Sequence, residues 1–247
     1  MVRERTVLLV VGGQRLLRLQ CLPTGLADLA LGLLTTSRLL HPAEPVPPMR
    51  VDHERGELVV DFSPPDGAIE QMRRSLTLGS GCGAALSPAA EFDPLDCWRK
   101  IDTSFAVAPA AVADAVSASV ARSGLFRETG GVHAAAIAHD DRVVAFAEDI
   151  GRHNAFDKVI GACRRQAIPL MDKLALVTGR LSLELVAKAV PSSIPVLVSR
   201  GAPTEAGVQL AEAANLTLIG FARAGRMNVY AAPWRLRQPP AAGATPP

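Results

Sequence analysis

Residues 174–221 read LALVTGRLSLELVAKAVPSSIPVLVSRGAPTEAGVQLAEAANLTLIGF, and this stretch decides the fold. Its short apolar runs at 174–177, 195–198 and 217–221 predict strands, because glycine, proline or charged residues separate them. Segments 182–190 and 204–215 lie between these runs and have the apolar spacing of helices. Strands alternating with helices of about ten residues predict an α/β fold with a largely parallel sheet covered on both faces.

The same pattern extends upstream, so residues 109–237 are predicted to form one α/β domain. Pro109 suits the first turn of a helix that runs to Gly124. Residues 133–139 and 143–146 predict two strands, and a further helix is expected from 154 to about 166. Asn154 suits the N-cap of that helix. Asp157, at the N3 position, can bond back to the N-cap residue much as in a capping box.

Residues 1–108 predict a small α+β domain that ends in a glycine-rich loop and a connector. Segments 6–11 and 15–22 predict one hairpin, and the segments around Val51 and 58–62 predict a second. Residues 24–40 have a helical period with Thr24 as N-cap, and the prolines of 42–48 mark a connector. The final residues, 238–247, are rich in Pro, Ala and Gly and are predicted to be a disordered tail.

Composition limits the classes of function. Hydrophobic residues make up 49% of the 247 residues and aromatic residues 4%, so the core must be aliphatic. A formal net charge of +2 gives no general attraction to nucleic acid or to anionic membranes. Any anionic ligand must therefore be held by a local cluster of residues.

The sequence has no convincing targeting segment, and its cysteines are few and widely spaced. Both features predict a cytoplasmic protein. The apolar run 7–11 stops at Gly12-Gly13, too early for a signal peptide, and no run reaches the roughly 20 residues of a membrane span. The four cysteines are widely spaced without a CxxC pair: Cys21, Cys82, Cys97 and Cys163. This pattern indicates free thiols in a reducing compartment rather than a disulfide scaffold.

Cys82 is the cysteine whose neighbours suggest reactivity. It lies in Gly79-Ser80-Gly81-Cys82-Gly83, where glycines provide no packing surface and allow unusual backbone angles. Such a loop gives a thiolate access to partners, although a cysteine in a tight turn would look the same. Cys163 follows apolar residues at helical spacing, and Cys21 lies in a strand-like segment, so both are expected to be structural.

Three polar segments are candidate anion sites. Arg152 and His153 precede the predicted helix, whose free N–H groups and dipole would favour a phosphate, although a solvated turn remains the alternative. Segment 220–228 places two arginines, Arg223 and Arg226, at a strand end, where open α/β sheets bind ligands. Phe221 could lie against a base there. The turn 178–180 occupies an equivalent strand end. For both segments the alternative to an anion site is an ordinary turn.

These segments together resemble the formate dehydrogenase accessory sulfurtransferases, the FdhD family. The resemblance covers about residues 77–232. It rests on TGGVHAA at 129–135, EDIGRHNAFDK at 148–158, Gly179-Arg180 with Ser182, Glu184 and Lys188, and the segment 220–230. The central block is long enough to be highly specific.

The resemblance implies a cytidine-deaminase-like α/β/α layered domain with a small N-terminal α+β domain. It implies that Cys82 receives sulfur from a cysteine desulfurase as a persulfide. The sulfur then passes to the bis-molybdopterin guanine dinucleotide cofactor (Mo-bis-MGD), a bound substrate, before its insertion into formate dehydrogenase. The protein is expected to form a homodimer. Neither a permanently bound cofactor nor a metal site is expected. The residues expected at the cofactor are Phe221, Ala222, Arg223, Ala224, Gly225, Arg226, Arg152, His133 and Arg180.

The sequence departs from the family pattern in two ways, and the first of them leaves a second hypothesis open. Ala85 stands where many members carry a second loop cysteine, and the usual Glu-Pro opening strand is missing. A cofactor chaperone that binds the dinucleotide without transferring sulfur is therefore the alternative. A zinc nucleobase deaminase is rejected, because His133 is followed by Ala134-Ala135 rather than x-Glu and no P-C-x-x-C motif follows.

Overall fold

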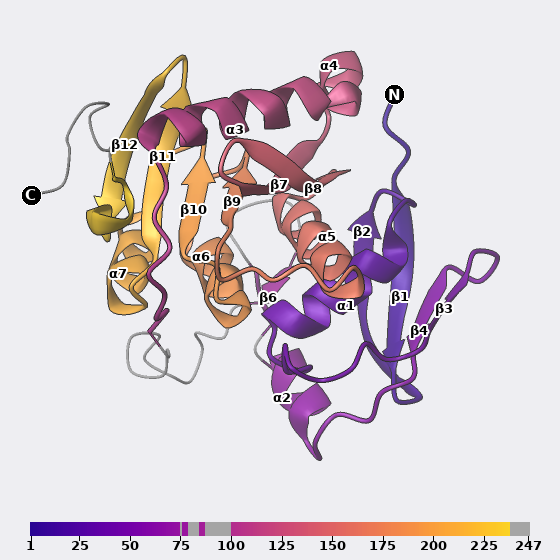
Figure 1. The fold of residues 1–247 in the computed structure, drawn as a ribbon. Helices are drawn as coiled ribbons and strands as arrows, with labels where there is room; N and C mark the ends of the chain where they lie inside the picture. The colour runs from indigo at the N-terminus through magenta and orange to yellow at the C-terminus, as the bar shows by residue number, and fades with distance from the viewer. Residues whose placement is uncertain (75, 79–83, 87–99, 238–247) are drawn as a thin grey trace, which may run out of the picture.

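Two main sheets organise the part of the chain that the computed structural model describes, residues 1–74, 76–78, 84–86 and 100–237 (Figure 1). The smaller sheet has the order β2-β1-β4-β3. Its strands are β1 (Arg5–Val11), β2 (Gln14–Cys21), β3 (Met49–Asp52) and β4 (Glu57–Val60). Both predicted hairpins are confirmed, since β1 pairs antiparallel with β2 and β3 with β4, while β1 and β4 are parallel.

The larger sheet has six strands in the order β12-β11-β10-β9-β7-β8. They are β7 (His133–His139), β8 (Arg142–Asp149), β9 (Leu174–Val177), β10 (Val196–Ser199), β11 (Thr217–Arg223) and β12 (Arg226–Ala231). Only β9, β10 and β11 run parallel, so the prediction of a largely parallel sheet is wrong. Each edge is built by a hairpin, β7–β8 or β11–β12, and hairpins add antiparallel strands.

Helices cover both faces of this sheet, as predicted (Figure 1). On one face lies α3 (Pro109–Arg122), and on the other lie α5 (Arg152–Arg165), α6 (Leu183–Ala189) and α7 (Glu205–Ala213). Strand side chains alternate between the two cores: Leu174 and Leu176 pack towards α3, whereas Ala175 and Val177 pack towards α5–α7. Short 3₁₀ turns follow α6 and β12, at Val190–Ser192 and Pro233–Arg235.

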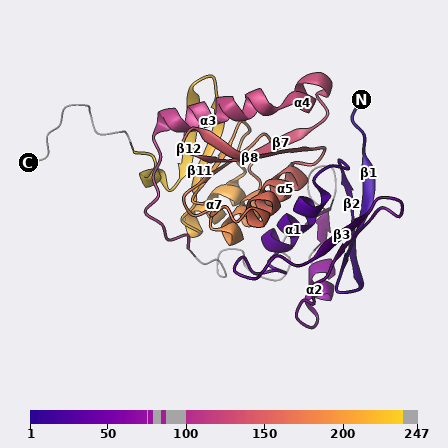
Figure 2. The ribbon, with the colours of Figure 1, turned by 45° about the vertical axis from the view of Figure 1, so that its right-hand side comes forward.

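The two sheets meet through a pair of helices. Helix α1 (Leu26–Thr36) packs its apolar residues on the smaller sheet and lies beside α5 in both views (Figures 1 and 2). The crossing is very close: a Cβ on Gly161 would lie 1.9 Å from the carbonyl oxygen of Asp28, and a Cβ on Gly32 would lie 1.7 Å from that of Asp157. Glycine at both positions therefore lets the two backbones touch.

Two helix starts differ from the prediction. Helix α1 is capped by Gly25 rather than Thr24, and α5 begins at Arg152 after Gly151, so Asn154 is not its N-cap. Four short elements were not predicted: α2 (Ala68–Arg74), α4 (Gly124–Thr129), and the pair β5 (Leu76–Leu78) and β6 (Ala84–Leu86). Strand β12 was also missed, because Ala224 and Gly225 both adopt positive φ and form the tight turn of a hairpin.

No helix within the described residues has the length and apolar character needed to cross a membrane.

Candidate functional site

A cavity of about 550 Å³ lies at the carboxyl ends of the three parallel strands. Its walls come from α3 and α4, from the segment 130–133, and from the residues that end β9, β10 and β11. This is the edge at which open α/β sheets bind ligands, and the volume is typical of a small-molecule site. The structure therefore places a cavity where the strand-end argument predicted one.

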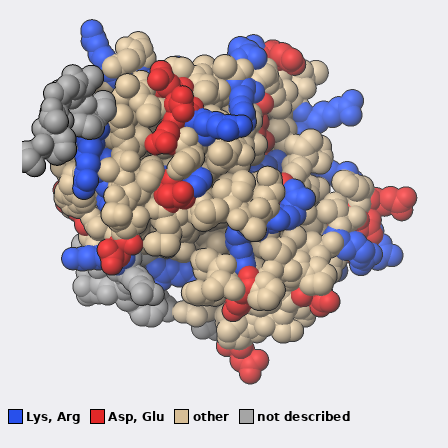
Figure 3. Space-filling model, in the orientation of Figure 1, with Lys and Arg blue, Asp and Glu red and all other residues tan. Residues whose placement is uncertain are grey.

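The cavity has a cationic lining. Arg127, Arg200 and Arg223 all contribute to its wall, and no aspartate or glutamate does among the described lining residues. The face seen in Figure 3 has no such bias, because basic and acidic side chains are scattered over it. The cavity thus provides the local cluster that the low net charge requires for an anionic ligand.

His133 presents a neutral imidazole to the cavity. It begins β7, and its Nδ1 lies 3.2 Å from Oγ1 of Thr178, which follows β9. The same hydroxyl oxygen accepts a 3.0 Å hydrogen bond from the Ala134 amide. Burial, and secondly the charge of Arg152, lower the pKa of His133 below its usual value. Because the pKa is lowered, the ring is uncharged at neutral pH and keeps a nitrogen lone pair.

Arg152 lies behind this wall, in the first turn of α5. Its side chain packs over Gly179, where a Cβ would come within 2.7 Å of the Arg152 Cδ atom. Its neighbour His153 has a pKa lowered to about 3 by burial, followed by the charges of Lys188, Arg152 and His133. Arg152 and His133 are thus close neighbours, as predicted, but His133 alone of the two lines the cavity. Arg180 is exposed and is likewise not among the lining residues.

The predicted motif 221–226 is divided by the β11–β12 turn. Arg223 lines the cavity, and Arg226 lies opposite it across the hairpin. Ala222 is buried in the core beneath α3. Phe221 is 36% exposed and, like Ala224, Gly225 and Arg226, is not among the lining residues. Of the six residues, the structure brings one to the cavity.

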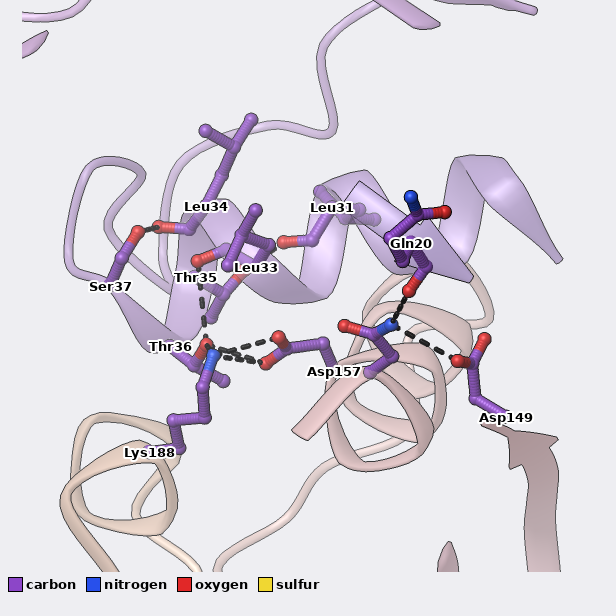
Figure 4. A network of polar contacts seen from close by, with 11 residues as sticks. Gln20, Leu31, Leu33, Leu34, Thr35, Thr36, Ser37, Asp149, Asp157 and Lys188 are labelled. Atoms are coloured by element: carbon purple, nitrogen blue, oxygen red, sulfur yellow. Dashed lines mark hydrogen bonds and ion pairs between the residues drawn. The ribbon is translucent and has the colours of Figure 1, made fainter. Parts of the chain in front are cut away.

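Much of the block 148–158 has a structural role. The buried Asp149 carboxylate lies 2.6 Å from Lys158 Nζ and accepts hydrogen bonds from the Leu22 amide and from Asn154 Nδ2, at 3.1 and 3.0 Å. Asn154 Nδ2 also donates to the Gln20 carbonyl at 2.8 Å. These contacts join the start of α5 to the end of β2, and Figure 4 shows those made with Gln20 and Asp149. The capping-box interpretation is therefore wrong for Asn154.

Asp157 is the centre of a second buried contact between distant segments. Its carboxylate binds Lys188 Nζ at 2.7 and 2.9 Å and accepts a 2.7 Å hydrogen bond from the Thr36 hydroxyl (Figure 4). The three residues come from α5, α6 and α1. Asp157 therefore does not take part in a capping box. It links α1, which packs on the smaller sheet, to the large domain.

Some lining residues were missed by the sequence argument. Arg200 and Gly201 follow β10, just as Thr178 and Gly179 follow β9, so the strand-end rule was able to find them. Phe126 and Arg127 come from α4, which gave no signal of periodicity because it has six residues. Within the described residues, no group of three potential metal ligands occurs.

The cysteines separate into two groups. Cys21 and Cys163 are buried, and burial raises their pKa values to about 11 and about 12, respectively. Both therefore stay protonated at neutral pH. Cys82, the predicted persulfide site, lies outside the described residues, as does Cys97. The segment 79–83 that contains Cys82 joins β5 to β6, which pair antiparallel from Leu78 and Ala84.

Comparison with known proteins gives consistent matches along the chain. The model of the FdhD/NarQ family matches residues 2–237. A sulfur carrier protein FdhD of Bacillus subtilis is 31% identical over 238 residues, covering 96% of this chain and 90% of the relative. That of Xanthomonas oryzae pv. oryzae is 36% identical over 246 residues, covering 98% and 87%.

A solved structure has the same fold. It is a crystal structure from Desulfotalea psychrophila, described as a formate dehydrogenase accessory protein, and it matches with a TM-score of 0.77. The match covers 95% of this chain and 90% of that one, at 23% sequence identity. At this identity the likeness concerns the fold.

Proposed function

Because this chain belongs to the FdhD/NarQ family, we propose that it is a sulfur carrier serving formate dehydrogenase. It accepts sulfur from a cysteine desulfurase as a persulfide on Cys82 and passes that sulfur to Mo-bis-MGD. The observation that carries the proposal is the match over nearly the whole length to relatives named sulfur carrier proteins. The expected setting is the cytoplasm, and the expected assembly is a homodimer.

The state of the other thiols supports Cys82 as the carrier. A thiolate is the nucleophile in sulfur exchange, and the raised pKa values of Cys21 and Cys163 keep both as buried thiols. In the proposed step the Cys82 thiolate attacks the outer sulfur of the desulfurase persulfide. The sulfur–sulfur bond of the donor breaks, the donor cysteine leaves as a thiolate, and Cys82 carries the transferred sulfur. No external oxidant or reductant is needed.

The cationic cavity supports binding of the dinucleotide substrate. Arg223 and Arg200 offer guanidinium groups suited to paired contacts with diphosphate oxygens. His133 offers a neutral hydrogen-bonding nitrogen held by Thr178. Arg152, Arg180 and the remaining residues of 221–226 are kept in this proposal as expected contacts of the dinucleotide. A cytidine-deaminase-like layering of the large domain belongs to it as well, consistent with the mixed sheet and its two helical layers.

The chaperone without sulfur transfer is the second candidate, favoured by one observation. Ala85 lies in β6, opposite Thr77 of β5, at the position of the family's second loop cysteine. A relay between two loop thiols is therefore impossible. Any sulfur transfer by this chain has to use a single persulfide, and the chaperone needs none. The two candidates differ in what removing the Cys82 sulfur does.

Expression in a bacterial strain that lacks its own FdhD protein and depends on one for formate dehydrogenase activity separates these candidates. We expect the wild-type chain and Cys97→Ser to restore the activity, and Cys82→Ser to restore none, at equal protein levels by immunoblot. Serine keeps the size of the side chain but cannot carry a persulfide. Full activity with Cys82→Ser would reject the sulfur carrier and leave the chaperone.

A further inference from the structure

Helix α4 forms part of the rim of the cavity and is held to the protein in an unusual way. It has six residues, Gly124–Thr129, and none of them is buried. Gly130, at its end, adopts a left-handed conformation with φ of 65°. So short and exposed a helix contributes little apolar burial, and its position must depend on polar contacts.

Glu148 provides the main polar contact at the first turn. Its two carboxylate oxygens accept hydrogen bonds from the Phe126 and Leu125 amides, at 2.9 and 3.2 Å. Glu148 belongs to β8, which is paired along its length with β7, so the anchor is part of a rigid sheet. A carboxylate at the positive end of a helix forms charge-assisted hydrogen bonds. Arg127 adds a second contact, donating to the Ala121 carbonyl at 2.6 Å.

Phe126 is the residue that the anchored helix α4 places at the cavity. Phe126 is one of the residues that line the cavity, and it is 45% exposed. It is the only phenylalanine, tyrosine or tryptophan among the described residues that line the cavity. Val116, Val120 and Ile150 line the cavity as well, and Arg127, Arg200 and Arg223 provide its cationic lining. An apolar aromatic surface combined with cationic groups suits a planar base joined to phosphates.

We propose that Phe126 stacks on the base of the bound nucleotide and that Glu148 is the positioning residue that holds Phe126 there. This inference rests on the proposed function, because it names the contact made by the nucleotide part of the dinucleotide substrate. It assigns the base to Phe126 on α4 rather than to Phe221, which is not among the residues that line the cavity. Glu148 acts through α4 and does not itself contact the ligand.

Isothermal titration calorimetry with GDP as the probe tests this assignment on the full-length protein. We expect Phe126→Ala to bind GDP about tenfold more weakly than wild type, which is the size of one lost stacking contact. Phe126→Tyr restores binding, since the ring is kept. Trp234→Ala, which removes an exposed aromatic side chain outside the cavity, is the matched control and should leave binding unchanged.

The role of Glu148 is tested by a double-mutant cycle. Glu148→Gln should weaken GDP binding in the wild-type background but not in the Phe126→Ala background, because its effect passes through Phe126. Equal weakening in both backgrounds would overturn the positioning role. Wild-type affinity in Phe126→Ala, or a loss found only in Phe221→Ala, would overturn the stacking assignment while leaving the proposed function intact. Absence of GDP binding by the wild-type protein would overturn both this inference and the cavity's proposed substrate.

Discussion

Replacing Gly161 with alanine should lower the free energy of unfolding by about 3 kcal/mol or more, or prevent folding altogether. The new methyl group would lie 1.9 Å from the Asp28 carbonyl oxygen and 2.8 Å from the Gly32 amide nitrogen. Both are backbone atoms of α1, so no side-chain rotation can relieve the clash and the two helices must separate. Separation would open the contact through which the small sheet joins the large domain.

Urea denaturation followed by far-ultraviolet circular dichroism measures this loss. Gly124→Ala is the matched control, because a Cβ there meets nothing within 4 Å. Alanine favours a helix over glycine by roughly 1 kcal/mol, so the control should be neutral or slightly stabilising. If Gly161→Ala were as stable as the control, the close crossing of α1 and α5 would be wrong.

Lys188→Met should destabilise the protein by about 3–5 kcal/mol at pH 7, because it leaves the Asp157 carboxylate buried without a cation. Asp157 is 1% exposed, and its remaining side-chain partner is the Thr36 hydroxyl. Burial raises the pKa of Asp157 even in the presence of Lys188, so the variant should take up a proton there. A group whose pKa is higher in the folded state stabilises at low pH, and the stability is lost as pH rises.

The defect should therefore shrink between pH 7 and pH 5, a direction that simple loss of packing would not produce. Thermal or urea unfolding of wild type and variant at both pH values checks this prediction. Lys100→Met, at an exposed lysine, is the control for loss of one positive charge. A pH-independent defect in Lys188→Met would show that Asp157 is not the origin of the instability.

Local sequence patterns predicted most elements of the large domain well. The strand at 174–177 has the predicted ends, because a short apolar run is bounded there by a lysine and by a glycine-containing turn. The hairpins of the small sheet followed from strand-like segments on either side of Gly12-Gly13 and of Glu54-Arg55-Gly56. These features depend on neighbours in sequence, which a pattern can register.

The errors arose where a residue's partner is distant in sequence. Asn154 looks like a helix cap, but its amide group bonds Gln20, which is 134 positions away. Asp157 looks like the N3 residue of the same capping box, but it pairs with Lys188 and Thr36 from two other helices. Parallel and antiparallel strands have similar local patterns, so the orientation of β7 was not readable either. Long-range polar contacts of this kind leave no periodic signal.

The candidate site was predicted in part for the same reason. Strand ends identified Arg223 and the turn 178–180, because the rule for open sheets concerns each strand separately. The rule did not supply α4, whose place at the cavity depends on two hydrogen bonds from its first turn to Glu148. Glu148 belongs to the block 148–158 that carries the family resemblance, and the structure shows it accepting hydrogen bonds from the first turn of that helix.

The most direct test of the sulfur-carrier account is mass spectrometry of the protein after incubation with a cysteine desulfurase and cysteine. The wild-type chain should gain one sulfur atom, reversed by dithiothreitol and located on the peptide that contains Cys82. The Cys82→Ser variant should gain none, and Cys97→Ser should gain as much as wild type. A protein that gains no sulfur, or that gains it equally in Cys82→Ser, would contradict the account.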